Sequence, residues 1–458
     1  MGAQPRRHLR EDRAAVHYLS ERSRGRGVGM DYQEARAFIA GKISGVHLEL
    51  DRIRALLYEL GNPEKELRFI HIAGTNGKGS IAAYLSAALT RAGFCTGVYT
   101  SPVVYTYGEQ FRVNGKMISG EQYTKLAEKM KSAVTRMERR GLVCPSNFEL
   151  ETVLAILFFS EQHCDYSILE CGMGGRDDAT NVIPAPVLAV FASISMDHTE
   201  FLGQTLPEIA SVKAGIIKRG CLAAVTSGQQ KETEEVLQSV CDSLGVPLVT
   251  GHPEQAEVLD NTIDGLTFRY KDLLFHTPLA GSCQAENAVT AFEALKILQK
   301  KEPELTDEKI LEGISAADWH GRFTRIAEHP DFVVDGAHNP RAADILRQSV
   351  LECYPERRRI FILGVFADKD YREVIRRTCD LADVLLCVET PDNERALPAE
   401  KLAEAAAEIF PEKTILAEKS IPDAVRRSFA LAGPDDLILS FGSLSNIGEI
   451  TGLMKHFT

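Results

Sequence analysis

Several features are scarce or missing in this sequence, and each absence excludes a class of protein. The ten cysteines include no Cys-x-x-Cys pair, so we expect neither a zinc ribbon nor a disulfide framework, and their scatter is typical of reduced, mostly buried thiols. No apolar run approaches the ~20 residues of a membrane span. Positive charge is in deficit, and the formal net charge of −12 argues against a general nucleic-acid-binding surface.

The remaining composition is that of a globular enzyme. Hydrophobic residues make up 44% and charged residues 25% of the 458 residues, which predicts two or three domains with a substantial core. Residues 1–29 differ, because they are rich in arginine and poor in apolar side chains. We expect a disordered extension there, or an upstream start codon before Met30. Acidic residues in the segment weigh against an organelle-targeting peptide.

The most informative motif is Gly74-Thr75-Asn76-Gly77-Lys78-Gly79-Ser80. It follows the apolar run 69–73 and precedes an alanine-rich stretch, so it predicts a strand, a glycine turn and a helix. Such a turn cradles phosphate, because backbone N–H groups and the helix N-terminus face the anion while Lys78 supplies a cation. The Ser80 hydroxyl is a candidate Mg²⁺ ligand, and ATP is the expected nucleotide.

The spacing of this motif departs from the common pattern G-x-x-x-x-G-K-[ST]. Ile72 stands six residues before Lys78, where that pattern has glycine, and the hydroxyl comes one residue later than usual. A glycine turn without a ligand is the alternative interpretation of the segment.

The predicted elements indicate an α/β fold with two units. Strands and helices alternate through residues 30–317, which we assign to an ATP-binding domain built around the phosphate loop. The elements expected there include a strand at Tyr166–Glu170, a hairpin of Leu266–Tyr270 and Leu273–His276, and a helix at Ala285–Gln299. Residues 318–322 are the expected linker. Five further apolar strands with helices between them predict a parallel, Rossmann-like α/β domain over 323–458.

Four other segments carry candidate functional groups. Glu149 opens an apolar helix, where simple capping explains a carboxylate equally well. Residues 170–181 place glycines and charges after a predicted strand, which is where α/β sheets bind ligands, although a mobile surface loop is the alternative. Residues 195–203 carry His198, for which a structural role is an alternative to Mg²⁺ binding. Asp335-Gly336-Ala337-His338-Asn339-Pro340 suits ribose binding as well as helix capping.

The order of these motifs resembles that of the folylpolyglutamate synthase/dihydrofolate synthase family of the Mur ligase superfamily. The glycine motif is followed by FE-x-x-T, GGR-x-DATN, DHTEFLG, KAG, Gln-x-x-Asn, Gly-Arg, DGAHNP, DKD and FGSL. The resemblance spans about Asp31 to Glu449. It implies an N-terminal P-loop ATPase domain of Mur-ligase type and a C-terminal Rossmann-like domain.

The resemblance also implies the chemistry. Members phosphorylate a substrate carboxylate with ATP, and L-glutamate then attacks the acyl phosphate to form an amide. The carboxylate belongs to 7,8-dihydropteroate or to a tetrahydrofolate, and many bacterial members accept both. ADP and phosphate are released. We therefore expect a cytoplasmic, monomeric enzyme with small-molecule substrates and no nucleic-acid or membrane partner.

The site residues follow from the same resemblance. Lys78 is expected at the β- and γ-phosphates, with Gly74, Thr75, Asn76, Gly77, Gly79 and Ser80 around them. Two Mg²⁺ ions are expected, one held by Ser80 and Glu149 and the other by His198. Lys213 matches a lysine that is carbamylated in the family, and Lys78, His198 and Lys213 form the expected catalytic set. The remaining nucleotide contacts are Asn287 at the adenine, Arg322 at the phosphates, Asp335 at the ribose and His338 beside the nucleotide.

Some positions depart from the family pattern. Val103 stands where histidine is frequent, and Gln110 where arginine is common. Both lie in a loop near the pterin and phosphate regions of relatives, so they bear on pterin specificity. Cys283 and Asp177 also differ from the usual residues. Three alternatives are another Mur-type amino-acid ligase, a P-loop kinase, and an inactive nucleotide-binding module. The presence of Lys78, Ser80, Glu149, His198 and Lys213 together argues against the last.

Overall fold

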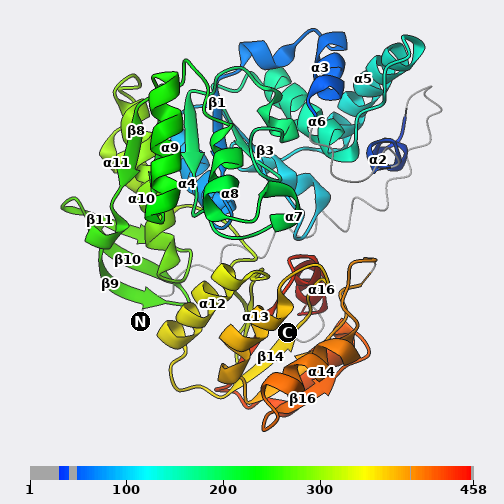
Figure 1. Ribbon diagram of the computed structural model, residues 1–458, viewed down its shortest axis with the longest axis vertical. Coiled ribbons are helices and arrows are strands. Elements are labelled where there is room, and N and C mark those ends of the chain that lie inside the picture. The colour runs from blue at the N-terminus through cyan, green and yellow to red at the C-terminus, as the bar shows by residue number, and fades with distance from the viewer. Residues whose placement is uncertain (1–29, 41–48, 392, 455–458) are drawn as a thin grey trace, which may run out of the picture.

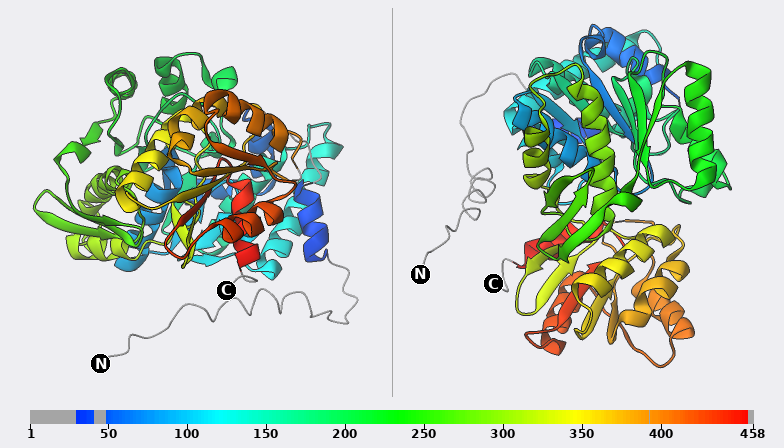
Figure 2. Two further views of the ribbon diagram at one scale, coloured as in Figure 1. Left: turned by 90° about the horizontal axis from the view of Figure 1, so that it is seen from below. Right: turned by 90° about the vertical axis from the view of Figure 1, so that its left-hand side faces the viewer.

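The computed structural model describes residues 30–40, 49–391 and 393–454. The predicted extension at residues 1–29 lies outside the described residues. Two α/β units are stacked along the long axis of the molecule (Figure 1). Each has its own sheet with helices on both faces, and the views in Figure 2 show that the units meet over a limited seam. The predicted α/β class is therefore confirmed.

The first unit is built on an eight-stranded sheet with the order β4-β3-β2-β5-β1-β6-β7-β8. Six strands, from β2 to β8 in that order, run parallel, and β3 and β4 add an antiparallel hairpin at one edge. Five of the parallel strands are buried throughout, which is why they are mostly apolar and do not alternate regularly between apolar and polar residues. The strands are β1 (Phe69–Ala73), β2 (Thr96–Tyr99), β3 (Phe111–Val113), β4 (Lys116–Met117), β5 (Tyr166–Glu170), β6 (Leu188–Phe191), β7 (Ala223–Ser227) and β8 (Leu248–Gly251).

Helices cover both faces of this sheet. One face packs on α4, α10 and α11, and the other on α3, α5 and α6 at one half and on α8 and α9 at the other. The helix α6 is apolar all round because it lies between the sheet and α5. The helices are α2 (Tyr32–Ala40), α3 (Asp51–Glu59), α4 (Lys78–Ala92), α5 (Gly120–Arg139), α6 (Asn147–Glu161), α7 (Thr199–Leu202), α8 (Leu206–Ala214), α9 (Lys231–Leu244), α10 (Cys283–Gln299) and α11 (Asp307–Ser315).

A small antiparallel sheet extends the first unit toward the second, with the order β11-β10-β9. The hairpin of β10 (Gly265–Tyr270) and β11 (Leu273–Thr277) was predicted, whereas the edge strand β9 (Glu257–Thr262) was not. Strand β9 contacts α12 of the second unit. Short 3₁₀ helices occur at Pro63–Glu66, Tyr107–Gln110, Ala179–Val182, Pro253–Gln255 and Cys379–Leu381.

The second unit has a six-stranded sheet with the order β12-β13-β17-β14-β15-β16. Five strands are parallel as predicted, but β12 is antiparallel to β13 at the edge. Helices α12, α13 and α14 pack on one face, and α15 and α16 on the other. The strands are β12 (Thr324–Ala327), β13 (Asp331–Val334), β14 (Arg359–Leu363), β15 (Val384–Cys387), β16 (Thr414–Ala417) and β17 (Leu437–Phe441). The helices are α12 (Pro340–Cys353), α13 (Tyr371–Thr378), α14 (Ala399–Ile409), α15 (Ile421–Leu431) and α16 (Ser445–Met454).

Candidate active site

The glycine motif forms the turn between β1 and α4, as its sequence predicts. Gly74 and Gly77 have φ angles of +144° and +94°, which side chains with a Cβ rarely adopt. A Cβ on Gly77 would lie 2.2 Å from Oδ1 of Asn287. Helix α4 begins at Lys78, so the free N–H groups of its first turn are available to an anion.

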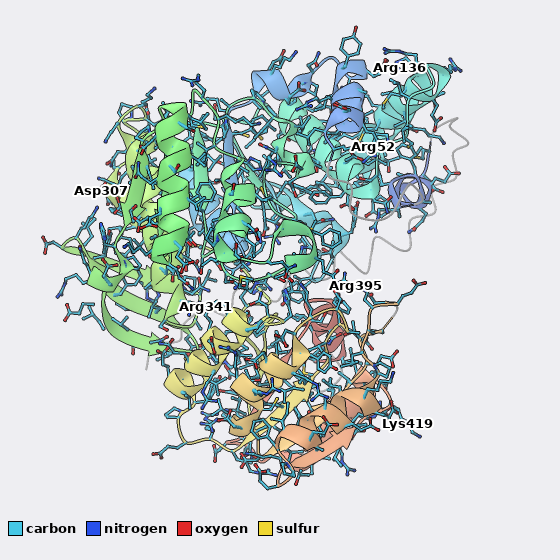
Figure 3. All side chains as sticks on the ribbon, in the orientation of Figure 1. Arg52, Arg136, Asp307, Arg341, Arg395 and Lys419 are labelled. Atoms are coloured by element: carbon cyan, nitrogen blue, oxygen red, sulfur yellow. The ribbon has the colours of Figure 1, made fainter. Side chains whose placement is uncertain are left out.

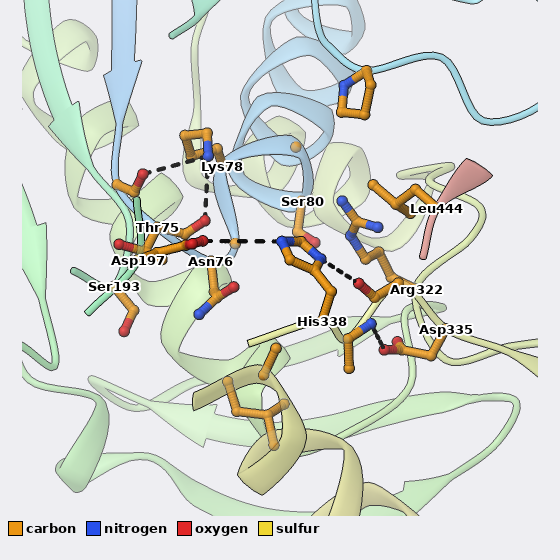
Figure 4. Close-up of a pocket in the computed structure, with 18 of the residues that line it drawn as sticks. Thr75, Asn76, Lys78, Ser80, Ser193, Asp197, Arg322, Asp335, His338 and Leu444 are labelled. Atoms are coloured by element: carbon orange, nitrogen blue, oxygen red, sulfur yellow. Dashed lines mark hydrogen bonds and ion pairs between the residues drawn. The ribbon is translucent and has the colours of Figure 1, made fainter. Parts of the chain in front are cut away.

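This turn opens into a cavity of about 340 Å³ between the two units. The first unit lines it with the glycine turn, the ends of β5 and β6, and the start of α10. The second unit contributes the β13–α12 junction and the segment before α16. Figure 4 shows Arg322, Asp335 and His338 converging on the turn that carries Lys78. The predicted residues that line the cavity are Gly74, Thr75, Asn76, Gly77, Lys78, Gly79, Ser80, His198, Lys213, Asn287, Arg322, Asp335 and His338.

Lys78 reaches into the cavity from the first turn of α4. Its Nζ donates hydrogen bonds to the carbonyl oxygens of Thr75 (3.2 Å) and Gly74 (3.4 Å). It also lies 3.9 Å from Oε1 of Glu170, the last residue of β5. Within the described part of the chain, the Lys78 Nζ contacts carbonyl oxygens and one carboxylate, and such an ammonium can also contact an incoming phosphate.

Glu170 is a cavity residue that the sequence interpretation did not assign as a ligand. Burial raises the pKa of its carboxyl, while Lys78 and Arg322 act in the opposite direction. Its Oε2 accepts a hydrogen bond from the backbone N–H of Ser101, at 3.3 Å, and Ser101 lines the cavity too. The position of Glu170 at the carboxyl end of a predicted strand was the signal that could have identified it.

Glu149 does not line the cavity, unlike the other predicted ligands. Its Oε2 accepts hydrogen bonds from the Ser146 backbone N–H (2.7 Å) and from Arg52 Nε (3.2 Å). The Ser146 hydroxyl in turn accepts from the Glu149 N–H, so the pair forms the capping box of α6. The structure therefore gives this carboxylate the capping role that the sequence left open.

Asp197 joins the two units across the cavity. Its Oδ1 is 2.9 Å from Nζ of Lys369, and its Oδ2 accepts a hydrogen bond from Asn339 at 3.2 Å. His198 and His338 each place Nε2 3.9 Å from Oδ2. Burial opposes ionisation of Asp197, but Lys369 and the histidines outweigh it and hold its pKa well below the ordinary value. Neither Asp197 nor Lys369 was among the predicted site residues, although both lie in recognised motifs.

Lys213 is buried at the end of α8, where its Nζ donates to the carbonyl oxygen of Gly74 at 2.8 Å. Burial, together with the nearby charge of Lys78, lowers the pKa of Lys213 to about 7. A large share of this amine is neutral near physiological pH, and a neutral amine is the form that reacts with CO₂.

Asp335 and His338 are oriented by backbone groups of the β13–α12 junction. The Asp335 carboxylate accepts from the N–H groups of Ala337 (2.7 Å) and Phe323 (2.8 Å). The ring Nδ1 of His338 is 2.8 Å from the carbonyl oxygen of Gly336, which requires Nδ1 to donate and leaves Nε2 facing Asp197. Burial and the charge of Lys369 lower the pKa of His338 to about 4, so the ring is neutral at pH 7.

Phe366, Lys369 and Arg395 also line the cavity. Arg395 lies over the Phe366 ring at 4.7 Å and pairs with Asp368 through two hydrogen bonds of 2.8 and 3.1 Å. It belongs to the loop 390–395, for which the sequence suggests either contacts with glutamate or an ordinary surface turn. Residue 392 of this loop lies outside the described residues.

Two kinds of feature are absent from the described residues. No cluster of three or more His, Cys, Asp or Glu side chains with metal-binding geometry occurs within them. No helix among those same residues is both long and apolar enough to cross a membrane.

Comparisons with known proteins agree with the geometry. Residues 72–295 match the Mur ligase middle domain, and residues 321–444 match the Mur ligase glutamate ligase domain. The dihydrofolate synthase/folylpolyglutamate synthase of Bacillus subtilis is 33% identical over 433 residues, covering 93% of this chain and 99% of the relative.

Solved structures are similar as well. The folylpolyglutamate synthase of Mycobacterium tuberculosis complexed with ADP superposes with a TM-score of 0.84 at 28% identity, over 92% of this chain and 98% of that one. A folylpolyglutamate synthase (FPGS) complexed with AMPPCP and folate gives a TM-score of 0.80 at 28% identity, over 93% of this chain and all (100%) of that one. The motif order, the two units around one phosphate cavity and these matches over nearly the full length lead to one conclusion: the chain belongs to the folylpolyglutamate synthase/dihydrofolate synthase family of Mur ligases.

Proposed function

We propose that this chain uses ATP to activate the carboxylate of a folate, of 7,8-dihydropteroate, or of both, and joins it to L-glutamate. The main support for this proposal is the cavity between the two units. One unit supplies a phosphate-binding turn with Lys78, and the other supplies Arg322, Asp335 and His338 to the same space. A nucleotide bound there would contact both units, as ATP-dependent ligation with an unstable intermediate requires.

The reaction needs activation because a carboxylate is a poor electrophile. The carboxylate oxygen attacks the γ-phosphorus of ATP and ADP leaves. The glutamate amine then attacks the acyl carbon, and phosphate departs with the original carboxylate oxygen. Lys78 and Arg322 offset the negative charge that spreads over the transferring phosphoryl group. Closure of the cavity around the acyl phosphate protects it from water.

Nucleotide binding would divide between the units. The N–H groups of Gly74–Ser80 and the Lys78 ammonium would hold the phosphates. Asp335 would accept hydrogen bonds from the ribose hydroxyls, and Asn287 would lie at the adenine. Domains at residues 30–317 and 323–458, joined by the linker 318–322, are part of the proposal, and so is a monomeric enzyme.

The cavity residues fit Mg²⁺, which prefers oxygen ligands. Glu170 is a buried carboxylate beside Lys78, and the hydroxyls of Ser80 and Ser101 line the same space. We propose that these oxygens hold one ion in place of the set that included Glu149, and that His198 and a carbamylated Lys213 hold the second. Bound Mg²⁺ would neutralise charge on the ATP phosphates and on the transferring phosphoryl group.

The two glutamates give a direct prediction about this assignment. Glu170→Gln is expected to lower kcat by about 100-fold, because a charged group at the phosphoryl site is lost. Glu149→Gln is expected to leave kcat within about threefold and to lower the free energy of unfolding by about 1–3 kcal/mol, through the capping box and Arg52. Steady-state kinetics and urea unfolding measure both effects. A large loss of kcat in Glu149→Gln but not in Glu170→Gln would instead assign the metal ion to Glu149.

An isotope experiment tests the acyl phosphate. The substrate carboxylate is labelled with ¹⁸O, and the phosphate released in the presence of ATP and L-glutamate is analysed by mass spectrometry. The mechanism transfers one ¹⁸O atom to each phosphate. Phosphate without ¹⁸O would exclude the acyl phosphate, and a stable phosphoester product would instead favour the kinase alternative.

A further inference from the structure

Four acidic side chains line the cavity, and three of them have partners. Glu170 lies near Lys78, Asp197 pairs with Lys369, and Asp335 accepts two backbone hydrogen bonds. The fourth, Glu286, differs. Its Oε1 is buried and has no hydrogen-bond partner among the described residues.

Glu286 lies in the first turn of α10, directly before Asn287. Its carboxylate is packed against the end of β7, since a Cβ on Gly228 would lie 2.6 Å from Glu286 Cδ. Small or apolar residues from both units line the same cavity. They consist of Ala280 and Cys283 before and within α10, and of Ala342, Ile345 and Leu346 on the facing side of α12.

The basic residues of the cavity gather elsewhere. Lys78 and Lys213 lie at the glycine turn, and Arg322 lies beside Gly336. Lys369 pairs with Asp197, and Arg395 pairs with Asp368. The positive charge that acts on Glu286 is Arg341 at the start of α12, which lines no part of the cavity. Figure 3 places Arg341 and Arg395 far apart along the seam between the units. Burial raises the pKa of Glu286 to about 7, and Arg341 opposes this rise.

A buried carboxylate without a donor is unfavourable, because its lost hydration is not replaced. Such groups in folded proteins are generally satisfied by a partner, a water or a ligand. The part of the lining that Ala280, Ala342, Ile345 and Leu346 contribute is apolar, so it suits an aromatic ring that carries a hydrogen-bond donor at its edge.

The orientation proposed for the nucleotide brings such a ring to this place. With the phosphates on the glycine turn and the ribose at Asp335, the base extends between α10 and α12. Adenine presents an amino group at position 6, which donates, whereas guanine presents a carbonyl oxygen there, which only accepts. A carboxylate accepts a hydrogen bond from the amino group of adenine, whereas it repels the carbonyl oxygen of guanine.

We propose that Glu286 accepts a hydrogen bond from the 6-amino group of adenine and is the residue that selects ATP over GTP. The inference rests on the proposed placement of ATP, and it adds a specificity determinant to that site. Glu286 is a recognition residue here and takes no part in the chemistry.

The test removes each partner of the hydrogen bond separately. Amide formation is measured at pH 8.5, where the Glu286 carboxyl is ionised, with ATP and with purine riboside 5′-triphosphate, which lacks the 6-amino group. The wild-type enzyme is expected to favour ATP by about 10- to 100-fold in kcat/KM. Glu286→Leu is expected to bring this ratio to within about threefold of one and to raise the use of GTP relative to ATP. Glu286→Gln keeps an acceptor oxygen and should retain more of the preference than Glu286→Leu.

The control is Glu293→Gln on the same helix. Glu293 pairs with Tyr270 and Lys271 outside the cavity, so its loss should leave the preference for ATP unchanged. Calorimetric binding of ADP and purine riboside diphosphate gives the same comparison without catalysis. No preference in the wild-type enzyme, or a preference that survives Glu286→Leu, would overturn the inference. Absence of amide product from a protein that still prefers ADP would instead overturn the proposed function and leave the inference standing.

Discussion

Replacement of Lys78 by alanine is expected to lower turnover by about 100- to 1,000-fold. Lys78 is the cation of the glycine turn, and its Nζ is held by two carbonyl oxygens and lies 3.9 Å from Glu170. Loss of the ammonium removes charge that would stabilise the transferring phosphoryl group. The measurement is the steady-state rate of ADP release at saturating folate and glutamate.

Lys116→Ala is a suitable control, because Lys116 lies on the exposed hairpin strand β4, away from the cavity. It should retain wild-type turnover. Thermal unfolding shows whether the Lys78 variant is folded, and a well-folded Lys78→Ala enzyme with turnover within about threefold of wild type would contradict the phosphate-binding role.

Removal of dissolved CO₂ is expected to lower activity severalfold, and bicarbonate is expected to restore it. The reason is Lys213, whose buried amine has a pKa lowered to about 7 against an ordinary value of 10.5. Because the pKa is lowered, the reactive neutral amine is the main form above pH 7 and is lost as the pH falls below 7. We expect carbamylation, and with it activity, to rise between about pH 6 and pH 8.5. Lys213→Met should lose about 100-fold in kcat.

Lys218 provides the matched control. It is another largely buried lysine, with a pKa lowered to about 8, but its Nζ donates to the carbonyl oxygens of Asn181 and Ile183 outside the cavity. With ¹³C-bicarbonate, NMR should show a carbamate signal in wild type and in Lys218→Met, and none in Lys213→Met. Activity that is independent of CO₂, with no carbamate signal, would show that Lys213 acts as a free amine.

Much of the fold was predictable because its parallel strands are buried on both faces. Strand β5 was predicted over Tyr166–Glu170, as the structure has it, and α10 was predicted to within two residues of its start. Strand β9 was missed because its side chains are almost all exposed, so it shows neither an apolar run nor an alternating pattern. The antiparallel direction of β12 could not be predicted from the sequence either, because it depends on how β12 pairs with β13.

Site residues were predictable where a local motif sets the backbone geometry. They were less predictable where contacts between distant parts of the chain determine their position. The glycine turn and the capped junction at Asp335 depend on local geometry, and both line the cavity. Glu149 and Glu170 could not be told apart in the same way. Each lies near one end of a helix or strand. Only the fold shows that β5 ends at the cavity, whereas the N-terminus of α6 faces Arg52. Asp197 and Lys369 are far apart in the sequence, so motif spacing could not predict that they form an ion pair.

The proposed ligase function is tested most directly by mass spectrometry of the products formed with ATP, Mg²⁺ and L-glutamate, with 7,8-dihydropteroate and tetrahydrofolate offered separately. One added glutamate on dihydropteroate would establish dihydrofolate synthase activity, and added glutamates on tetrahydrofolate would establish polyglutamylation. We expect at least one of these products, formed with stoichiometric release of ADP and phosphate. Neither product, from folded protein that binds ATP, would contradict this expectation and direct attention to the loop with Val103 and Gln110.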